Sequence, residues 1–254
     1  MIKRALNYFN LFPPVTAIKF IVFGFLKKSL NPKSIVTYSQ FGEDQYIQTL
    51  LHKIPNGFYL DVGCNHPIRF SNTFNLYCSG WKGICVDANP HIIKEFQSLR
   101  KKDIAVCAAV SDEEKDVDFF ESTLDLASTL DRSFVENEWA DKDYQLKKTH
   151  KMRTITLDSI LSSQRDRQSS PVHKIDLLCI DVEGHDLNVL KSINLKQYKP
   201  HLIVIEMHGF NKDRPEDSEI YKYMKEQDYN LAGYHIINGF FTSNELEKLN
   251  TSDC

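Results

Sequence analysis

The chain has 254 residues, of which 42% are hydrophobic and 26% are charged, and its formal net charge is -3. A chain of this length and composition can bury a sizeable core, so we expect one large α/β domain over residues 38–254. The small negative charge argues against a nucleic-acid partner, which would require a strong basic excess. The six cysteines form no C-x-x-C pair, and Cys85, Cys107 and Cys179 lie in apolar runs, so we expect reduced thiols in a cytoplasmic protein.

Residues 1–37 are expected to form a basic, apolar extension ahead of this domain. Residues 1–42 contain Lys3, Arg4 and four further lysines but no Asp or Glu. The apolar stretch over 11–26 is interrupted by two prolines and a lysine, and it is shorter than the about 20 apolar residues that a membrane span needs. Two interpretations remain open: a helix packed on the domain, or a cationic segment, residues 1–34, that makes peripheral contact with an anionic membrane surface.

Short apolar runs alternate with helical patterns through the rest of the chain. Strands are predicted at 58–62, 82–87, 103–112, 117–120, 153–157, 175–184 and 201–208. Helices are predicted at 45–54, 75–79, 91–100, 158–161, 187–193 and 218–227. Residues 229–236 and 240–242 read as a closing hairpin around Asn238-Gly239. This alternation predicts a doubly wound, mostly parallel sheet with an antiparallel hairpin at its C-terminal edge.

Two polar stretches carry little hydrophobic periodicity. Residues 162–170 read as a solvated loop. Residues 121–150 read as an excursion from the scaffold, and such insertions commonly shape substrate pockets.

Ionisable residues follow four of the predicted strands. The strand at 58–62 breaks into a turn at Gly63, and the next strand ends at Asp87, 26 residues after Asp61. In nucleotide-binding βαβ units, an acid about 20 residues beyond the glycine turn accepts the ribose hydroxyls. Two later strands end in Asp181 with Glu183 and in Glu206 with His208. Because ligands of open α/β sheets bind beyond the carboxyl ends of the strands, we predict a nucleotide-cofactor site at this edge.

A set of short motifs in the chain resembles the FkbM family of S-adenosylmethionine-dependent methyltransferases over roughly residues 38–210. The motifs are Ser39-Gln-Phe-Gly-Glu-Asp44, Asp61-Val-Gly-Cys-Asn65, Cys85-Val-Asp-Ala-Asn-Pro90, Ala108-Ala-Val-Ser111, Thr154-Ile-Thr-Leu-Asp158, Asp181-Val-Glu-Gly184 and Ile205-Glu-Met-His208. The most specific of them is Asp-Val-Glu-Gly after a buried strand. The chain departs from many relatives after the first turn, where residues 65–73 replace a further glycine.

This resemblance implies a Rossmann-like, seven-stranded methyltransferase fold and methyl transfer to a hydroxyl of substrates such as sugars or polyketide products. The implied acceptor is a small molecule or a glycan. The amino-acid end of S-adenosyl-L-methionine is expected at the first turn, Asp87 is expected to hold its ribose, and residues 109–111 are expected to flank its adenine. The full set of expected cofactor-binding residues is Asp61, Gly63, Asn65, Asp87, Ala88, Ala109, Val110 and Ser111.

Asp181, Glu183 and His208 are then expected to face the methyl group as catalytic residues. An alcohol must lose its proton as the methyl bond forms, and we favour His208 or Asp181 as a metal-independent general base, with Glu183 positioning the acceptor. The alternative is a Mg²⁺ ion held by Asp181 and Glu206, which would lower the pKa of the alcohol directly. Glu206 would otherwise orient the imidazole, because residues two apart on a strand share a face.

Two other functions compete with an O-methyltransferase acting on a sugar, a glycan or a glycosylated precursor. An NAD-linked oxidoreductase would also place an acid after the second strand, but no G-x-G-x-x-G follows the first strand. The other alternative is a non-catalytic, membrane-associated binding protein that keeps the fold.

Overall fold

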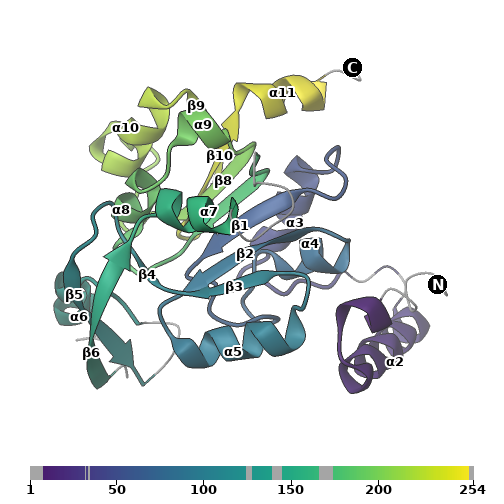
Figure 1. The fold of residues 1–254 in the computed structure, drawn as a ribbon. Helices are drawn as coiled ribbons and strands as arrows, with labels where there is room; N and C mark the ends of the chain where they lie inside the picture. The colour runs from purple at the N-terminus through teal and green to yellow at the C-terminus, as the bar shows by residue number, and fades with distance from the viewer. Residues whose placement is uncertain are drawn as a thin grey trace.

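The computed structural model describes residues 8–31, 33, 35–123, 128–138, 145–165 and 174–251. Lys3 and Arg4 lie outside these ranges, as do parts of the predicted polar stretches 121–150 and 162–170. The described elements form a seven-stranded sheet between two layers of helices, with a smaller three-stranded sheet at one side (Figure 1).

The main sheet has the strand order β3-β2-β1-β7-β8-β10-β9. Its strands are β1 (Phe58–Val62), β2 (Lys82–Asp87), β3 (Ile104–Cys107), β7 (Leu177–Ile180), β8 (Leu202–Glu206), β9 (Tyr229–His235) and β10 (Asn238–Ser243). The first five strands of that order are parallel, and β10 pairs antiparallel with both β8 and β9. The predicted α/β fold with an antiparallel C-terminal hairpin is confirmed. The winding direction reverses between β1 and β7, where open α/β sheets bind their ligands.

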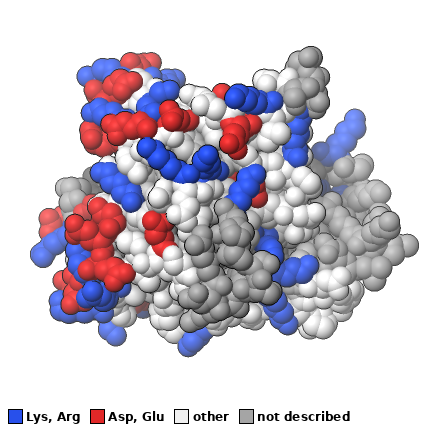
Figure 2. Space-filling view, turned by 45° about the horizontal axis from the view of Figure 1, so that its top comes forward, with Lys and Arg blue, Asp and Glu red and all other residues white. Residues whose placement is uncertain are grey.

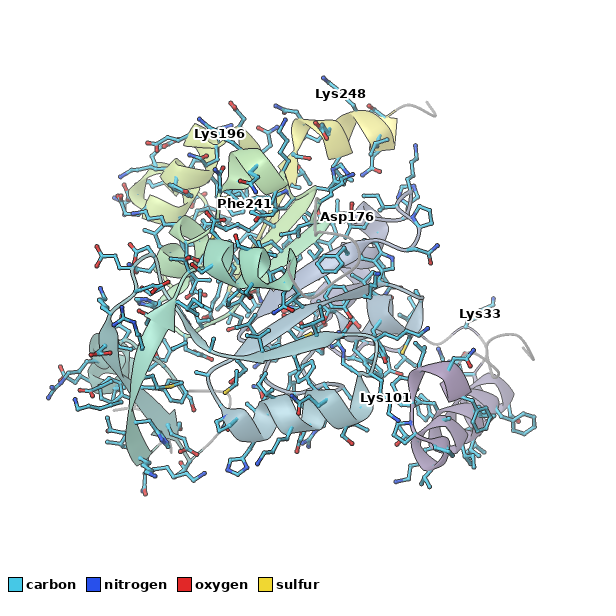
Figure 3. The ribbon with its side chains drawn as sticks, in the orientation of Figure 1. Lys33, Lys101, Asp176, Lys196, Phe241 and Lys248 are labelled. Atoms are coloured by element: carbon cyan, nitrogen blue, oxygen red, sulfur yellow. The ribbon has the colours of Figure 1, made fainter. Side chains whose placement is uncertain are left out.

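Alternate residues of each strand supply the cores on the two faces of the sheet. The helices are α2 (Pro14–Leu30), α3 (Glu43–Leu50), α4 (Phe74–Cys78), α5 (Pro90–Leu99), α6 (Arg132–Glu138), α7 (Leu157–Arg165), α8 (Asp186–Lys191), α9 (Leu195–Tyr198), α10 (Glu219–Glu226) and α11 (Asn244–Thr251), together with the short 3-10 helix η2 (Pro215–Asp217). Leu60 belongs to the cluster under α7, α8, α9 and α10, whereas its neighbour Tyr59 belongs to the cluster under α3, α4, α5 and α11. Phe241 of β10 is fully buried in the first cluster (Figure 3).

The predicted single strand at 103–112 is wrong, because the chain changes sheets at Ala108. β2 ends at Asp87, so β3 has no partner beyond the pair of Cys107 with Asp87. The next two residues form β4 (Ala109–Val110), which pairs with Thr154 and Ile155 in the three-stranded sheet β4-β6-β5.

The other strands of this small sheet are β5 (Asp116–Ser122) and β6 (Leu146–Ile155). β5 contains the predicted strand 117–120, and it lies outside the main sheet. β6 is longer than the predicted strand 153–157, and it begins inside the stretch read as an excursion. Most of its residues before Thr154 are exposed, so pairing with β5 rather than burial defines this strand.

The predicted turn at Asn238-Gly239 is also wrong. Both residues lie in β10, opposite His235 and Tyr234 of β9, so the chain turns at residues 236–237. Ile236 takes the left-handed conformation there, with φ 57°. Gly239 serves packing instead, because a Cβ at this position would lie 2.5 Å from the sulfur of Met207.

The N-terminal segment packs on the domain at its start and projects from it further along. Leu11, Phe12 and Ala17 are buried in the same cluster as Phe74 and Tyr77 of α4. After the half-buried Ile21, by contrast, residues 22–26 of α2 are all exposed. Within the described ranges, no helix is both long enough and apolar enough to cross a bilayer.

Candidate active site

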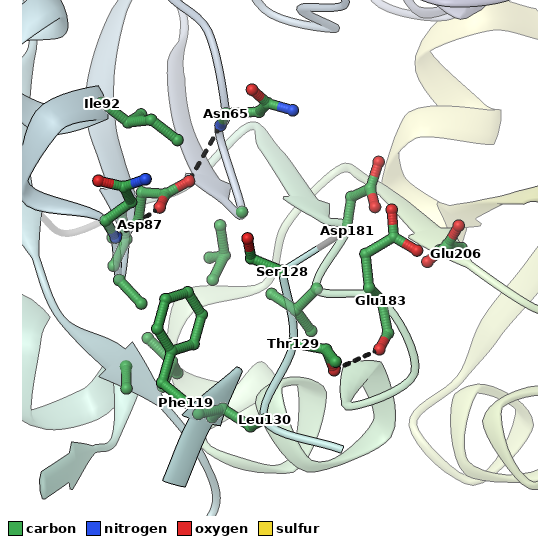
Figure 4. A pocket seen from close by; sticks show the side chains of 18 of the residues that line it. Asn65, Asp87, Ile92, Phe119, Ser128, Thr129, Leu130, Asp181, Glu183 and Glu206 are labelled. Atoms are coloured by element: carbon green, nitrogen blue, oxygen red, sulfur yellow. Dashed lines mark hydrogen bonds between the residues drawn. The ribbon is translucent and has the colours of Figure 1, made fainter. Parts of the chain in front are cut away.

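A pocket lies at the carboxyl ends of β1, β2, β7 and β8, where the winding of the main sheet reverses (Figure 4). Its lining includes six of the eight residues expected to bind the cofactor: Gly63, Asn65, Asp87, Ala88, Ala109 and Val110. The three residues expected to be catalytic, Asp181, Glu183 and His208, line the same pocket, and so does Glu206. The structure therefore brings most of the predicted site residues to one cavity.

Gly63 is required where the turn after β1 touches the end of β7. Its φ is 74°, and a Cβ at this position would lie 1.7 Å from the carbonyl oxygen of Asp181. The amides of Gly63 and Cys64 both donate to the carbonyl of Val86, at 2.9 and 3.3 Å, which fixes the turn against β2. A residue with a side chain cannot take this place without moving the Asp181 backbone.

Asp87 joins the turns that follow β1 and β2. Its Oδ2 accepts a hydrogen bond from the amide of Asn65 at 3.1 Å, and its Oδ1 accepts one from the amide of Asn89 at 2.8 Å. Figure 4 shows the first of these bonds beside Ile92 at one end of the pocket. The carboxylate is thus held by backbone amides from two loops, in the position expected for a ribose-binding acid.

The wall next to Asp87 is mostly apolar. Ala88 and the two residues of β4 line it together with Ile92 and Phe119. A flat aromatic group fits such a wall without leaving polar atoms unpaired. Ser111 does not line it: the residue is fully buried, and its Oγ lies 2.9 Å from Nε2 of His185.

Asp61 also lies outside the pocket lining, within β1 rather than beyond its carboxyl end. Its Oδ2 accepts a 2.6 Å hydrogen bond from Thr73 Oγ1, which in turn accepts one from the buried Arg100 at 3.0 Å. Burial raises the pKa of Asp61, and the Thr73 hydrogen bond opposes that rise. Arg100 also donates to Asp103 Oδ2 at 2.7 Å. The carboxylate of Asp61 is therefore bound inside the domain by Thr73, and Val62 is the residue of β1 that lines the pocket.

The other end of the pocket gathers three carboxylates and an imidazole. Nε2 of His208 lies 3.0 Å from Oε1 of Glu206 and 3.9 Å from Oε2 of Glu183. The Glu206 side chain is 2% exposed and that of His208 is 34% exposed, so the buried acid orients a base that reaches the cavity. The ring of Phe134 from α6 lies over the imidazole, with 5.3 Å between centroids.

A strained turn presents Asp181 and Glu183. Glu183 and Gly184 are both left-handed, with φ 55° and 94°. Asp186 stabilises the turn, because its carboxylate accepts from the amides of Val182 and Gly184, each at 3.0 Å. Backbone strain of this kind in a non-glycine residue is common at functional sites.

The acidic surroundings change the proton affinity of this turn. Burial, together with the nearby carboxylate of Glu206, raises the pKa of Asp181 well above its usual range, and the imidazole of His208 opposes the rise. Burial and the carboxylate of Asp181 raise the pKa of Asp186 to about 7. Asp181 is therefore a better proton acceptor than an ordinary aspartate.

Glu183, Glu206 and His208 are also the residues that could hold a metal ion. One ligand atom from each lies within 4.8 Å of the other two. The metal alternative predicted from sequence paired Asp181 with Glu206, and the described part of the chain groups Glu206 with Glu183 and His208 instead. The same three side chains can serve either as a cation site or as a carboxylate-supported base.

Several residues of the pocket lining were not predicted from the sequence. They are Gln40, Phe70, Ser128, Thr129, Leu130, Phe134 and Ile237. Four of them come from the stretch 121–150. The sequence predicts that this stretch shapes the pocket, but it does not indicate which of its residues do so. Thr129 also stabilises the turn that carries Asp181 and Glu183, since its Oγ1 donates to the carbonyl of Glu183 at 2.7 Å (Figure 4).

A comparison with known protein families gives a match over most of the domain. The family model described as the methyltransferase FkbM domain matches residues 61–231, which include every residue of the pocket lining except Gln40 and Ile237. A search of curated proteins found no matching relative.

Proposed function

Because the chain belongs to the FkbM methyltransferase family, we propose that it methylates a hydroxyl group of a sugar or glycosylated acceptor with S-adenosyl-L-methionine as donor. The observation that carries this proposal is the imidazole of His208, held 3.0 Å from the buried Glu206 at the opposite end of the pocket from Asp87. A cofactor-binding acid and a supported base then share one cavity, which is the arrangement that alcohol methylation requires.

The residues at the Asp87 end fit this cofactor. Asp87 offers a carboxylate for two ribose hydroxyls, and Ala88, Ala109 and Val110 offer an apolar wall for the adenine. Gly63 lets the backbone of the first turn approach closely, as an amino-acid group bound there requires. When bound, S-adenosyl-L-methionine supplies a methyl group already activated by its positively charged sulfur.

The residues at the His208 end of the pocket remove the hydroxyl proton of the acceptor. His208 accepts the hydroxyl proton as the oxygen attacks, and Glu206 stabilises the imidazolium that results. Asp181 is the alternative proton acceptor because its pKa is raised. Glu183 accepts a hydrogen bond from a neighbouring acceptor hydroxyl and fixes the attack angle. This chemistry proceeds without a metal ion in our proposal.

Polar lining residues support a sugar as the acceptor. Gln40, Asn65, Ser128 and Thr129 contribute amide and hydroxyl groups to the pocket, and these can bind several hydroxyls of one ring. The aromatic ring of Phe134 adds a flat surface beside His208.

The test measures formation of S-adenosylhomocysteine with a panel of free and nucleotide-linked sugars, each paired with its deoxy and amino analogues. We expect turnover with a hydroxylated sugar and none with the deoxy form. Turnover with amino analogues alone would overturn the hydroxyl assignment. Activity lost in EDTA and restored by Mg²⁺ would replace the metal-independent base by the Glu183, Glu206 and His208 cation site.

A further inference from the structure

Large apolar side chains are exposed along one face of α2, at positions that follow the three- and four-residue spacing of a helix. Of the 14 large hydrophobic residues that are exposed in the described ranges, nine lie between residues 9 and 35. They are Phe9, Val15, Ile18, Val22, Phe23, Phe25, Leu26, Leu30 and Ile35. Phe25 is 64% exposed and Leu30 is 84% exposed. A contiguous run of exposed large apolar side chains marks an interaction surface, so this face of the helix needs a covering partner.

The start of this N-terminal segment is anchored on the domain by contacts with α4. The hydroxyl of Tyr77 donates to the carbonyl of Leu11 at 3.0 Å. The ring of Phe12 packs against Phe74, Tyr77 and Phe20, with centroid distances of 5.9, 5.7 and 5.0 Å. Aromatic packing therefore anchors the start of this segment on the domain, and α2 lies at the lower right of Figure 1.

The charges around this segment have one sign. Residues 1–42 carry six of the 31 basic side chains and none of the 34 acidic ones, so residues 43–254 carry 25 basic and 34 acidic side chains. Lys19 on α2 is exposed, and so is Lys33, which follows the end of the helix (Figure 3). Figure 2 shows acidic side chains at the left of the view, over α10 and the β5–β6 hairpin, where they are intermixed with basic ones.

We propose that this surface, residues 9–35, docks on the face of an anionic lipid bilayer. The combination of large apolar side chains with lysines and no acid is that of an interfacial helix, which buries its apolar residues below the headgroups and pairs its lysines with anionic lipids. A second copy of the chain fits poorly, because pairing would bring two acid-free basic segments together without a counter-charge.

Exposed apolar side chains continue from this surface toward the pocket rim. Phe41 and Phe70 are exposed, and Phe70 lines the pocket together with Gln40. The amide of Ser71 donates to the carbonyl of Tyr38 at 3.1 Å, which ties the segment after α2 to the loop that carries Phe70. Docking of the surface would therefore place this rim near the bilayer.

The test is co-sedimentation of the full chain with phosphatidylcholine vesicles, with and without phosphatidylglycerol. The test variant is F25Q/L30Q, and the matched control is L146Q/L249Q, which replaces two exposed apolar residues outside the surface. We expect the wild type to bind anionic vesicles in low salt and to dissociate as salt rises. The test variant should bind roughly tenfold or more weakly, because two apolar side chains no longer enter the lipid.

The control should bind like the wild type, and both variants should keep the wild-type unfolding midpoint. Absence of wild-type binding to anionic vesicles in low salt would overturn the proposal, and so would equal losses in the two variants. Ultracentrifugation covers the remaining outcome: a dimer that F25Q/L30Q abolishes, without any vesicle binding, would assign the surface to a second copy of the chain.

Discussion

The two ends of the pocket are built in different ways. At the Asp87 end, backbone amides from two neighbouring turns hold one carboxylate, at 3.1 and 2.8 Å. At the His208 end, side chains from β7, β8 and α6 meet, and their carboxylates perturb one another. Local chain geometry therefore creates the first end, whereas tertiary packing and charge create the second. The first should tolerate changes of charge around it, and the second should not.

The largest expected effect is the loss of the base. His208→Ala should lower turnover by about 10² to 10⁴, the usual contribution of a general base, with the affinity for S-adenosyl-L-methionine unchanged. Formation of S-adenosylhomocysteine and calorimetric titration measure the two quantities. His91→Ala, an exposed histidine on α5, is the matched control and should keep full activity. Full activity in His208→Ala would leave Asp181 as the base.

The second effect concerns the contact between the turn after β1 and the end of β7. Gly63→Ala should lower the free energy of unfolding by roughly 2 kcal/mol or more, because the new Cβ meets the Asp181 carbonyl at a positive φ. Gly24→Ala in α2 is the control, since a Cβ there meets nothing within 4 Å. It should change stability by at most a gain of about 1 kcal/mol. Urea denaturation measures the free energy of unfolding of both variants. Equal values for Gly63→Ala and Gly24→Ala would show that the two turns are not in contact.

A smaller loss is expected in cofactor affinity. Asp87→Ala should weaken the binding of S-adenosyl-L-methionine by roughly 1.5 to 3 kcal/mol, the range for hydrogen bonds to a charged group. Asp61→Asn should leave the affinity unchanged, because Asp61 lies outside the pocket lining and bonds to Thr73. Calorimetry on the folded variants measures both. The reverse result, with Asp61 essential and Asp87 dispensable, would restore Asp61 to the site.

The last effect concerns the pH dependence of stability. The folded pKa of Asp186 is raised from 3.8 to about 7, so its native state disfavours ionisation. Below about pH 4 both folded and unfolded states are protonated, and no cost arises. As the pH rises toward 7, the unfolded state ionises first and the free energy of unfolding falls.

Asp186→Asn should remove this pH dependence. The free energy of unfolding of the wild type, taken relative to the variant, should therefore decline between about pH 4 and pH 7 and then level off. Urea denaturation at several pH values provides the measurement. A constant difference over this range would mean that Asp186 is ionised throughout.

The contrast between the two ends also explains what the sequence could predict. The alternation of apolar runs led to the correct α/β class, and the spacing from Gly63 to Asp87 led to two turns that do meet. Asp61 and Ser111 sit within the same motifs, but both are buried outside the pocket lining, where Asp61 bonds to Thr73 and Ser111 to His185. A motif locates a turn more reliably than it locates the direction of each side chain.

The failures share a physical cause. Residues 146–152 are mostly exposed and polar, so β6 carries no hydrophobic pattern and forms because β5 lies beside it. Asn238-Gly239 has the composition of a hairpin turn, yet Gly239 is needed for contact with Met207 and the chain turns two residues earlier. Ser128, Thr129 and Phe134 reach the pocket through the same tertiary arrangement. Local sequence does not encode such partners.

The small sheet has a consequence for evolution and engineering. Ala109 and Val110 of β4 pair with Thr154 and Ile155 of β6, so the segment between them leaves and re-enters the domain at adjacent points. Its ends are already held together, and exchanging residues 111–153 between homologues would require no new loop closure. Asp87, Asp181, Glu206 and His208 all lie outside the exchanged piece. Transplanting this cassette should therefore transfer acceptor preference while leaving the donor machinery of the recipient in place.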